Sequence, residues 1–101
     1  MAVKEFTIII GNEIYFPKIN VKIDKGGGRF LYCASLYILE DEETKQLCKI
    51  DNYHEKGNHI HYYKKDGNEG RQESFNFESI GKTIDFLILN WKKIMEERKN
   101  E

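Results

Sequence analysis

The sequence predicts an α+β domain, an antiparallel β-meander of five or six strands with one C-terminal amphipathic helix packed on one face. Two observations support this prediction. The first three quarters of the chain contain short segments rich in β-branched and aromatic residues, each followed by a turn signal. The last quarter has apolar residues at helical spacing. Because the chain has 101 residues, we expect one domain over residues 1–101.

Six segments show the strand pattern: residues 4–10, 18–24, 29–39, 45–53, 59–65 and 71–77. Pro17 is expected at the entry to the second strand, since it has no N–H to donate to a ladder. The strongest turn signal is the lysine and glycine run at 25–28, because glycine accepts a positive φ without strain. The sequence leaves open whether the first strand pairs beside 59–65 or at the far edge of the sheet.

The helix is expected over residues 79–98, with Ser79 as its N-cap. One face of this helix is apolar and consists of Ile80, Ile84, Leu87, Ile88, Trp91, Ile94 and Met95. Such a stripe more often covers a core than binds a partner. We therefore expect the helix to cover one face of the sheet, with Trp91 in the core.

Composition excludes several classes of protein. Sixteen basic and seventeen acidic residues leave a net charge of −1, so no global field would draw the chain onto nucleic acid or an anionic membrane. The sequence has neither a secretory apolar region nor a segment of membrane-spanning length, which predicts a soluble, cytoplasmic protein. Cys33 and Cys48 lack the spacing of a disulfide scaffold or a zinc site and are interpreted as small buried hydrophobes.

Loop lengths predict which side chains meet across the sheet. A four-residue loop at 25–28 sets Ile23 opposite Phe30 and Val21 opposite Tyr32, with both apolar sets on one face. A five-residue loop from residue 54 to 58 gives these opposed pairs: Ile50 with Tyr62, Asp51 with His61, Lys49 with Tyr63, and Tyr53 with His59. A loop over residues 67–70 adds these pairs: Phe75 with Tyr62, Phe77 with Ile60, Ser74 with Tyr63, and Asn76 with His61.

These registers predict a polar cluster on the face away from the helix: Lys49, Asp51, Tyr53, His59, His61, Tyr63, Ser74 and Asn76. His59 and His61 point the same way, about 6.6 Å apart along one strand. Asp51 would accept an imidazole N–H from His61, select its tautomer and raise its basicity. Two histidines oriented in this way suit general acid–base catalysis.

Three interpretations of this cluster compete. In the first, His61 is the base oriented by Asp51 and His59 is the acid in cleavage of an RNA phosphodiester, with no cofactor. Substrate contacts would come from Lys49, Tyr53, His54, Tyr63, Ser74 and Asn76. In the second, His59, His61 and Asp51 bind a divalent transition metal. In the third, the face is an ordinary polar surface that serves solubility or docks a partner.

The segment "KIDNYHEKGNHIHYYKKDG", followed by a short strand and an amphipathic helix, resembles the TumE-like family of small toxins from prokaryotic toxin–antitoxin pairs. The resemblance spans about residues 45–95 and depends on Asp51, Asn52, His54, His59 and His61. It implies a prokaryotic cytoplasmic toxin with a cognate antitoxin that acts on RNA or on the translation machinery.

The leading hypothesis is therefore a toxin-like ribonuclease that uses the His-x-His pair and no metal. The alternative is a non-catalytic interaction module. Its open sheet face or an edge strand would bind a partner protein, and a second copy of the chain in a homodimer is one such partner.

Overall fold

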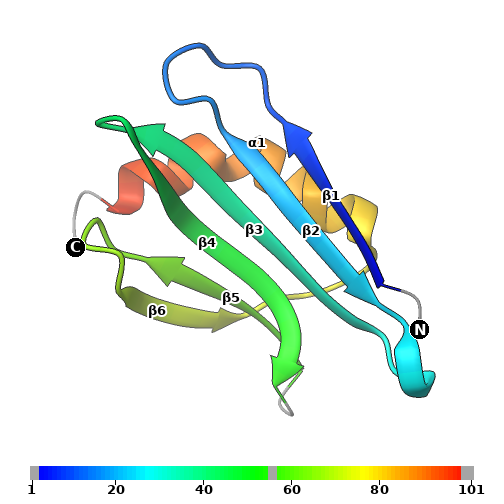
Figure 1. Cartoon of the computed structure of the whole chain (residues 1–101). Coiled ribbons are helices and arrows are strands. Elements are labelled where there is room, and N and C mark those ends of the chain that lie inside the picture. Colours follow the sequence, from blue (N-terminus) through cyan, green and yellow to red (C-terminus); the bar gives the residue numbers. More distant parts are fainter. Residues whose placement is uncertain (1–2, 55–56, 99–101) are drawn as a thin grey trace.

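The computed structural model describes residues 3–54 and 57–98 (Figure 1). Six strands form one antiparallel sheet in sequential order, and one helix follows them. The elements are β1 (Val3–Ile9), β2 (Lys18–Asp24), the 3-10 turn η1 (Gly26–Gly28), β3 (Leu31–Glu40), β4 (Glu43–His54), β5 (Gly57–Tyr63), β6 (Glu69–Ser74) and α1 (Ile80–Arg98). The predicted antiparallel meander with one C-terminal helix is confirmed.

The core lies between α1 and one face of the sheet, across which the helix runs in Figure 1. In β2 the side chains alternate, so that Ile19 and Val21 are fully buried. Leu87 and Trp91 on α1 are at most 5% exposed, and Trp91 packs edge-on against Tyr15. The apolar face of the helix thus covers the core as expected.

Both ends of α1 have specific partners. At its start, Ser79 Oγ accepts the N–H of Lys82 at 3.1 Å, which confirms Ser79 as the N-cap. At its end, the buried Arg98 donates to both carboxylate oxygens of Glu40 at 2.9 and 3.0 Å. Ile88 is 38% exposed, so it lies at the margin of the apolar face rather than inside the core.

The β2–β3 register differs from the predicted one by two residues. Ile23 lies opposite Tyr32 and Val21 opposite Ala34. The glycine run forms a 3-10 turn with Gly27 at φ 65°, so the connection continues to residue 30 instead of ending at 28. Since the error is an even number of residues, each side chain keeps its predicted face.

The β4–β5 connection, in contrast, is shorter than predicted. β4 continues to His54 and β5 starts at Gly57, so the connection is residues 55–56, which lie outside the described residues. The predicted opposed pairs in this hairpin are therefore wrong by two residues. The observed pairs are Ile50 with Ile60, Asp51 with His59, and Lys49 with His61.

The β5–β6 turn spans residues 64–68 rather than 67–70. Lys64 N–H donates to Asn68 O, and Gly67 has a φ of 91°. The predicted pairs of this hairpin are wrong by four residues, and the observed ones are His59 with Ser74, His61 with Gln72, and Tyr62 with Arg71. Phe75 and Phe77 follow the strand on the helix side, where Phe75 meets Phe86 and Phe77 stacks on Tyr32.

The position of the first strand, which the sequence left open, is the edge of the sheet opposite β6. β1 pairs with β2 along its whole length, and no irregularity interrupts their register. Among the described residues, no helix has the length and apolar character needed to cross a membrane.

Candidate functional site

The centre of the predicted cluster is Asp51, a carboxylate with no exposed surface on the sheet face away from α1. Its Oδ1 lies 3.4 Å from His61 Nε2 and its Oδ2 lies 3.4 Å from Lys49 Nζ. Within the described part of the chain neither oxygen has a partner at hydrogen-bond geometry. A buried carboxylate usually requires short, well-aligned hydrogen bonds. Asp51 is therefore an under-satisfied charge at the centre of the cluster.

His61 is 3% exposed and lies between two carboxylates. Asp51 contacts Nε2, while Glu69 Oε1 is 3.0 Å from Nδ1. Asp51 and His61 are close together as predicted, but as diagonal neighbours rather than directly opposed residues. The predicted hydrogen bond between Asp51 Oδ1 and His61 Nε2 is not formed at their 3.4 Å separation. The two carboxylates differ in mobility, because the Asp51 side chain is 1% exposed and that of Glu69 is 45% exposed.

His59 lies directly opposite Asp51 on one side and Ser74 on the other. Its ring centroid is 6.5 Å from that of His61, close to the predicted spacing. Its Nδ1 lies 3.2 Å from Gly57 O. Because a carbonyl oxygen only accepts, this contact is a hydrogen bond when the imidazole carries its proton on Nδ1.

Lys49 and Tyr63 lie beside the buried carboxylate. Burial lowers the pKa of Lys49, but Tyr63 and Asp51 outweigh it, and the net shift is upward. The pKa of Tyr63 is raised by burial and by Glu69 and Asp51, against the opposing effect of Lys49. At neutral pH the site therefore presents an ammonium group and a phenolic O–H, both of which donate hydrogen bonds.

Tyr53 and Cys33 complete the surroundings of Asp51. Tyr53 is 50% exposed, and burial together with Cys33 and Asp51 raises its pKa. Cys33 pairs with Asp51 across β3 and β4, and burial is the largest cause of its raised pKa. A thiol with a raised pKa is a poor nucleophile. Like the fully buried Cys48, Cys33 is a free thiol.

Asn52 holds β4 in place where its pairing is interrupted. The register of β4 against β5 shifts between Asp51 and His54, and β4 curves along its length in Figure 1. Across the other side of β4, Asn52 Oδ1 accepts the N–H of Tyr32 at 2.9 Å and its Nδ2 donates to Phe30 O at 2.8 Å. This side chain replaces backbone pairing next to Asp51, so it is a positioning residue.

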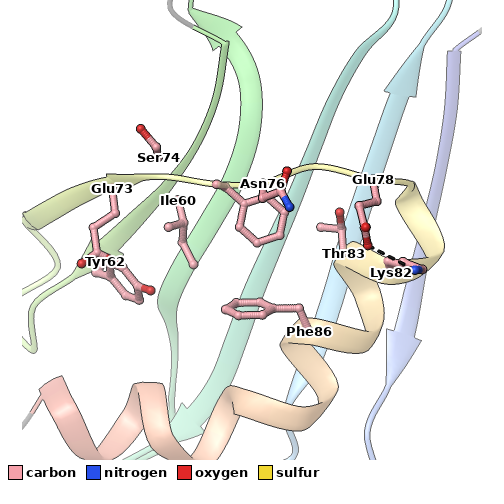
Figure 2. A pocket seen from close by; sticks show the side chains of 10 residues that line it. Ile60, Tyr62, Glu73, Ser74, Asn76, Glu78, Lys82, Thr83 and Phe86 are labelled. Atoms are coloured by element: carbon pink, nitrogen blue, oxygen red, sulfur yellow. Dashed lines mark ion pairs between the residues drawn. The ribbon is translucent and has the colours of Figure 1, made fainter.

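Asn76 is not part of the cluster. It follows β6 and lines a pocket of about 490 Å³ on the helix side of the sheet, shown in Figure 2. Ile60, Phe75 and Phe86 are among its apolar lining residues, and Lys82 and Glu78, which also line it, form an ion pair at 3.2 Å. Because Ile60 alternates with His59 and His61 along β5, the pocket and the histidines lie on opposite faces.

Sequence reasoning missed Glu69 and Gln72, which lie opposite Tyr63 and His61. Both were misplaced because the loop was expected three residues later. The pair Asp66-Gly67 was the available signal, since Asp-Gly is a strong marker of a tight hairpin. In the structure Asp66 accepts the N–H of Asn68 at 2.9 Å within that turn.

Two further predictions concern His54 and a metal. The backbone of His54 ends β4, and its side chain lies outside what the structure describes. Among the side chains that the structure describes, which do not include that of His54, no group of three or more histidine, cysteine, aspartate or glutamate residues has an arrangement that could hold a metal ion.

Comparison with known proteins adds no relative to this description. No protein-family model matches the chain, and neither a curated protein nor a solved structure matches it significantly. The resemblance to TumE-like toxins stays a prediction.

Proposed function

We propose that the sheet face around Asp51, His59 and His61 cleaves RNA by acid–base catalysis, as a toxin-like ribonuclease. The observation that carries the proposal is the fully buried Asp51 carboxylate, held at 3.4 Å from both His61 and Lys49. A polar face that served only solubility would leave such a carboxylate in water, because burying a charge is costly. A buried polar group without a hydrogen-bond partner requires an explanation, and a catalytic role is one such explanation.

The reaction needs no water and no metal in its first step. One histidine takes the proton of the ribose 2′-hydroxyl, whose oxygen attacks the adjacent phosphorus. The bond from phosphorus to the 5′-oxygen breaks, and the second histidine protonates that oxygen. The products are a 2′,3′-cyclic phosphate and a 5′-hydroxyl. Lys49 and Tyr63 donate hydrogen bonds to the charge that builds on the phosphorane oxygens.

His61 is the base in this scheme and His59 the acid. The Asp51 carboxylate lies 3.4 Å from Nε2 of His61, so Nδ1 is the nitrogen that would receive the proton. Glu69 lies at that nitrogen, at 3.0 Å, but its half-exposed side chain on an edge strand is able to turn away. A substrate phosphate is also an anion and would take the place of the Glu69 carboxylate.

The decisive experiment uses purified protein and a short oligoribonucleotide, with a matched strand that lacks one 2′-hydroxyl. Wild type should release a cyclic phosphate from the first strand and leave the deoxy linkage intact. His59→Asn should slow cleavage by about 10²- to 10⁴-fold, because one proton transfer is lost. Asn20→Ala, on the same sheet face but bonded to Thr7, is the control and should match wild type. Cleavage of the deoxy linkage, or full activity in His59→Asn, would overturn the proposal.

A cellular test accompanies it. Induced wild type should stop bacterial growth with decay of RNA, and the His59→Ala/His61→Ala variant should not. His61 is only 3% exposed, so its removal should also lower stability, contrary to what an exposed site would predict. Circular dichroism must therefore show that the variant is folded. The resemblance adds a cognate antitoxin as the proposed partner and the prokaryotic cytoplasm as the proposed location.

A non-catalytic interaction module is the second candidate. The observation in its favour is the exposed aromatic ring of Tyr53 beside the cluster. In that case substitutions at Tyr53 and Tyr63 would weaken partner binding by graded amounts, and His59→Asn would have little effect.

A further inference from the structure

We infer that β1 is a self-association strand through which two copies of this chain join their sheets. This surface is distinct from the histidine cluster, and the inference does not depend on the proposed function. The two edge strands of the sheet, β1 and β6, differ in the features that permit or prevent pairing with a further strand.

The β6 edge has the features that prevent strand pairing. All six of its residues are exposed, its sequence EGRQES has no large apolar residue, and its register against β5 is irregular. Charge and bulges of this kind protect an edge from a further strand. Arg71 also forms ion pairs with Glu73 and Glu97.

The β1 edge carries charge at Lys4 and Glu5, but it also has large apolar side chains and no bulge. Its seven residues pair with β2 in an unbroken register. Val3 is 61% exposed and Ile9 is 72% exposed, both large apolar side chains on the face away from α1. A long, regular and apolar edge strand is a template for pairing with another strand.

The direction of the free backbone groups follows from the first hydrogen bond beyond the strand. Ile10 N–H donates to Pro17 O at 2.9 Å, which continues the β1–β2 register. In an antiparallel pair such bonds recur at every second residue. The even-numbered residues of β1 therefore bond to β2, and the backbone groups of Val3, Glu5, Thr7 and Ile9 point away from the sheet.

This alternation restricts how β1 can pair with its own copy. In a symmetric antiparallel pair, outward-pointing residues must face outward-pointing residues, so the two-fold axis must pass through a residue and not between two. An axis at Lys4 or Glu5 would place like charges directly opposite each other. An axis at Thr7 would set Glu5 against Ile9 and leave Val3 beyond the partner strand.

A two-fold axis through Phe6 pairs outward-pointing residues with each other, opposes no like charges and uses the whole strand. It pairs Val3 with Ile9 and Glu5 with Thr7 of the other copy. The two most exposed apolar side chains of β1 then cover each other on one face. On the other face Phe6, already packed against the core, meets its own copy. Glu5 keeps its neighbour Lys22, 4.0 Å away on β2. A second copy of this chain fits because this register opposes no like charges, uses the whole length of the strand and matches the direction of the free backbone groups.

The first test measures molecular mass by light scattering over a range of concentrations. Wild type should approach the mass of a dimer as concentration rises. Thr7→Pro removes an outward N–H and the side-chain bond from Asn20, but no backbone hydrogen bond to β2, and it should raise the dimer dissociation constant at least tenfold. Gln72→Pro is the matched control on the other edge. Its N–H also points away from the sheet, since Phe75 N–H bonds to Asn58 O three residues further on. It should leave the dimer unchanged.

The second test fixes the register and stands even if a proline variant does not fold. In a Phe6→Cys variant the two new thiols lie in a non-hydrogen-bonded pair with Cα atoms about 4.5 Å apart, within disulfide range. Mild oxidation with diamide should cross-link this variant. Ile8 is also partly buried, but an Ile8→Cys variant would place its two thiols about 13 Å apart along the paired strands. It should not cross-link above the background of the native cysteines.

Three results would overturn the inference. The first is a wild-type protein that stays monomeric at the highest concentration. The others are equal dimer dissociation constants for Thr7→Pro and Gln72→Pro, and equal yields of cross-linked dimer for Phe6→Cys and Ile8→Cys.

Discussion

The two carboxylates on His61 are expected to affect activity in opposite ways. Asp51 has a 1% exposed side chain and cannot leave Nε2 without a rearrangement of the sheet. Glu69 is 45% exposed and sits at the nitrogen that must accept the substrate proton. Asp51→Asn should therefore remove the group that orients the base, whereas Glu69→Ala should remove a competitor of the substrate.

The exposure of the two side chains sets the magnitude of each effect. A half-exposed ion pair such as that between Glu69 and His61 contributes about 0–1 kcal/mol. If substrate must displace it, Glu69→Ala should raise kcat/KM by up to about fivefold, since 1.36 kcal/mol corresponds to tenfold. Loss of an oriented acid–base group costs about 10²- to 10⁴-fold, which we expect for Asp51→Asn.

The assay is cleavage of a fluorogenic oligoribonucleotide at substrate concentrations well below KM, with circular dichroism and a thermal melt for each variant. Asn20→Ala again serves as the control on the same face. If Glu69→Ala were as inactive as Asp51→Asn while both remained folded, Glu69 would belong to the catalytic machinery, and its assignment as a displaceable group would be refuted.

Two further predictions concern stability. Burial raises the pKa of the Glu40 carboxyl, but Arg98 and Lys45 outweigh this effect and the net shift is downward. The ionised carboxyl therefore stabilises the fold above the unfolded-state pKa of about 4.3, and this stabilisation is lost as pH falls through the folded-state pKa. Glu40→Gln should lower the free energy of unfolding by up to about 3 kcal/mol at pH 7 in urea titrations. A difference from wild type that stays constant down to pH 3 would contradict this. Asn52→Ala removes two hydrogen bonds, one to Tyr32 in β3 and one to Phe30 just before it, and should lower the free energy of unfolding by about 2 kcal/mol. A loss no larger than that of the Asn20→Ala control, expected below about 0.5 kcal/mol, would show that Asn52 does not hold β4.

Much of the fold could be predicted because the spacing of apolar side chains, every second residue in a strand and every 3.6 residues in a helix, can be read within one segment of the chain. The apolar alternation of β2 predicts that Ile19 and Val21 share the core face, and both are fully buried. The helical spacing of Leu87 and Trp91 predicts the face of α1 that contacts the sheet. Within the paired strands, faces were predicted correctly even where opposed pairs were not, because all three register errors were even numbers of residues. Asn76 is an exception, since it follows the end of β6 and lies on the helix side.

The candidate site was predictable only in part. His61 meets Asp51 and Lys49 lies beside them, as their common face suggested. Asn76 was wrongly included because β6 ends at Ser74 and not at residue 77, and Glu69 was missed because the β5–β6 turn ends earlier than predicted. No pattern along the chain reports the register shifts in β4 and β6, which come from backbone geometry at the turns and bulges.

The sequence by itself determined the succession of six strands and one helix, the face on which most side chains of the paired strands lie, and the presence of histidines beside an aspartate on the face away from the helix. These follow from periods of 2 and 3.6 residues, which each segment carries alone. Only the tertiary structure decided which strands lie at the edges, which residues are directly opposed, and that Asp51 and His61 are buried rather than exposed. Those features depend on contacts between segments that are distant in the chain, and turn geometry, strand curvature and packing set those contacts together.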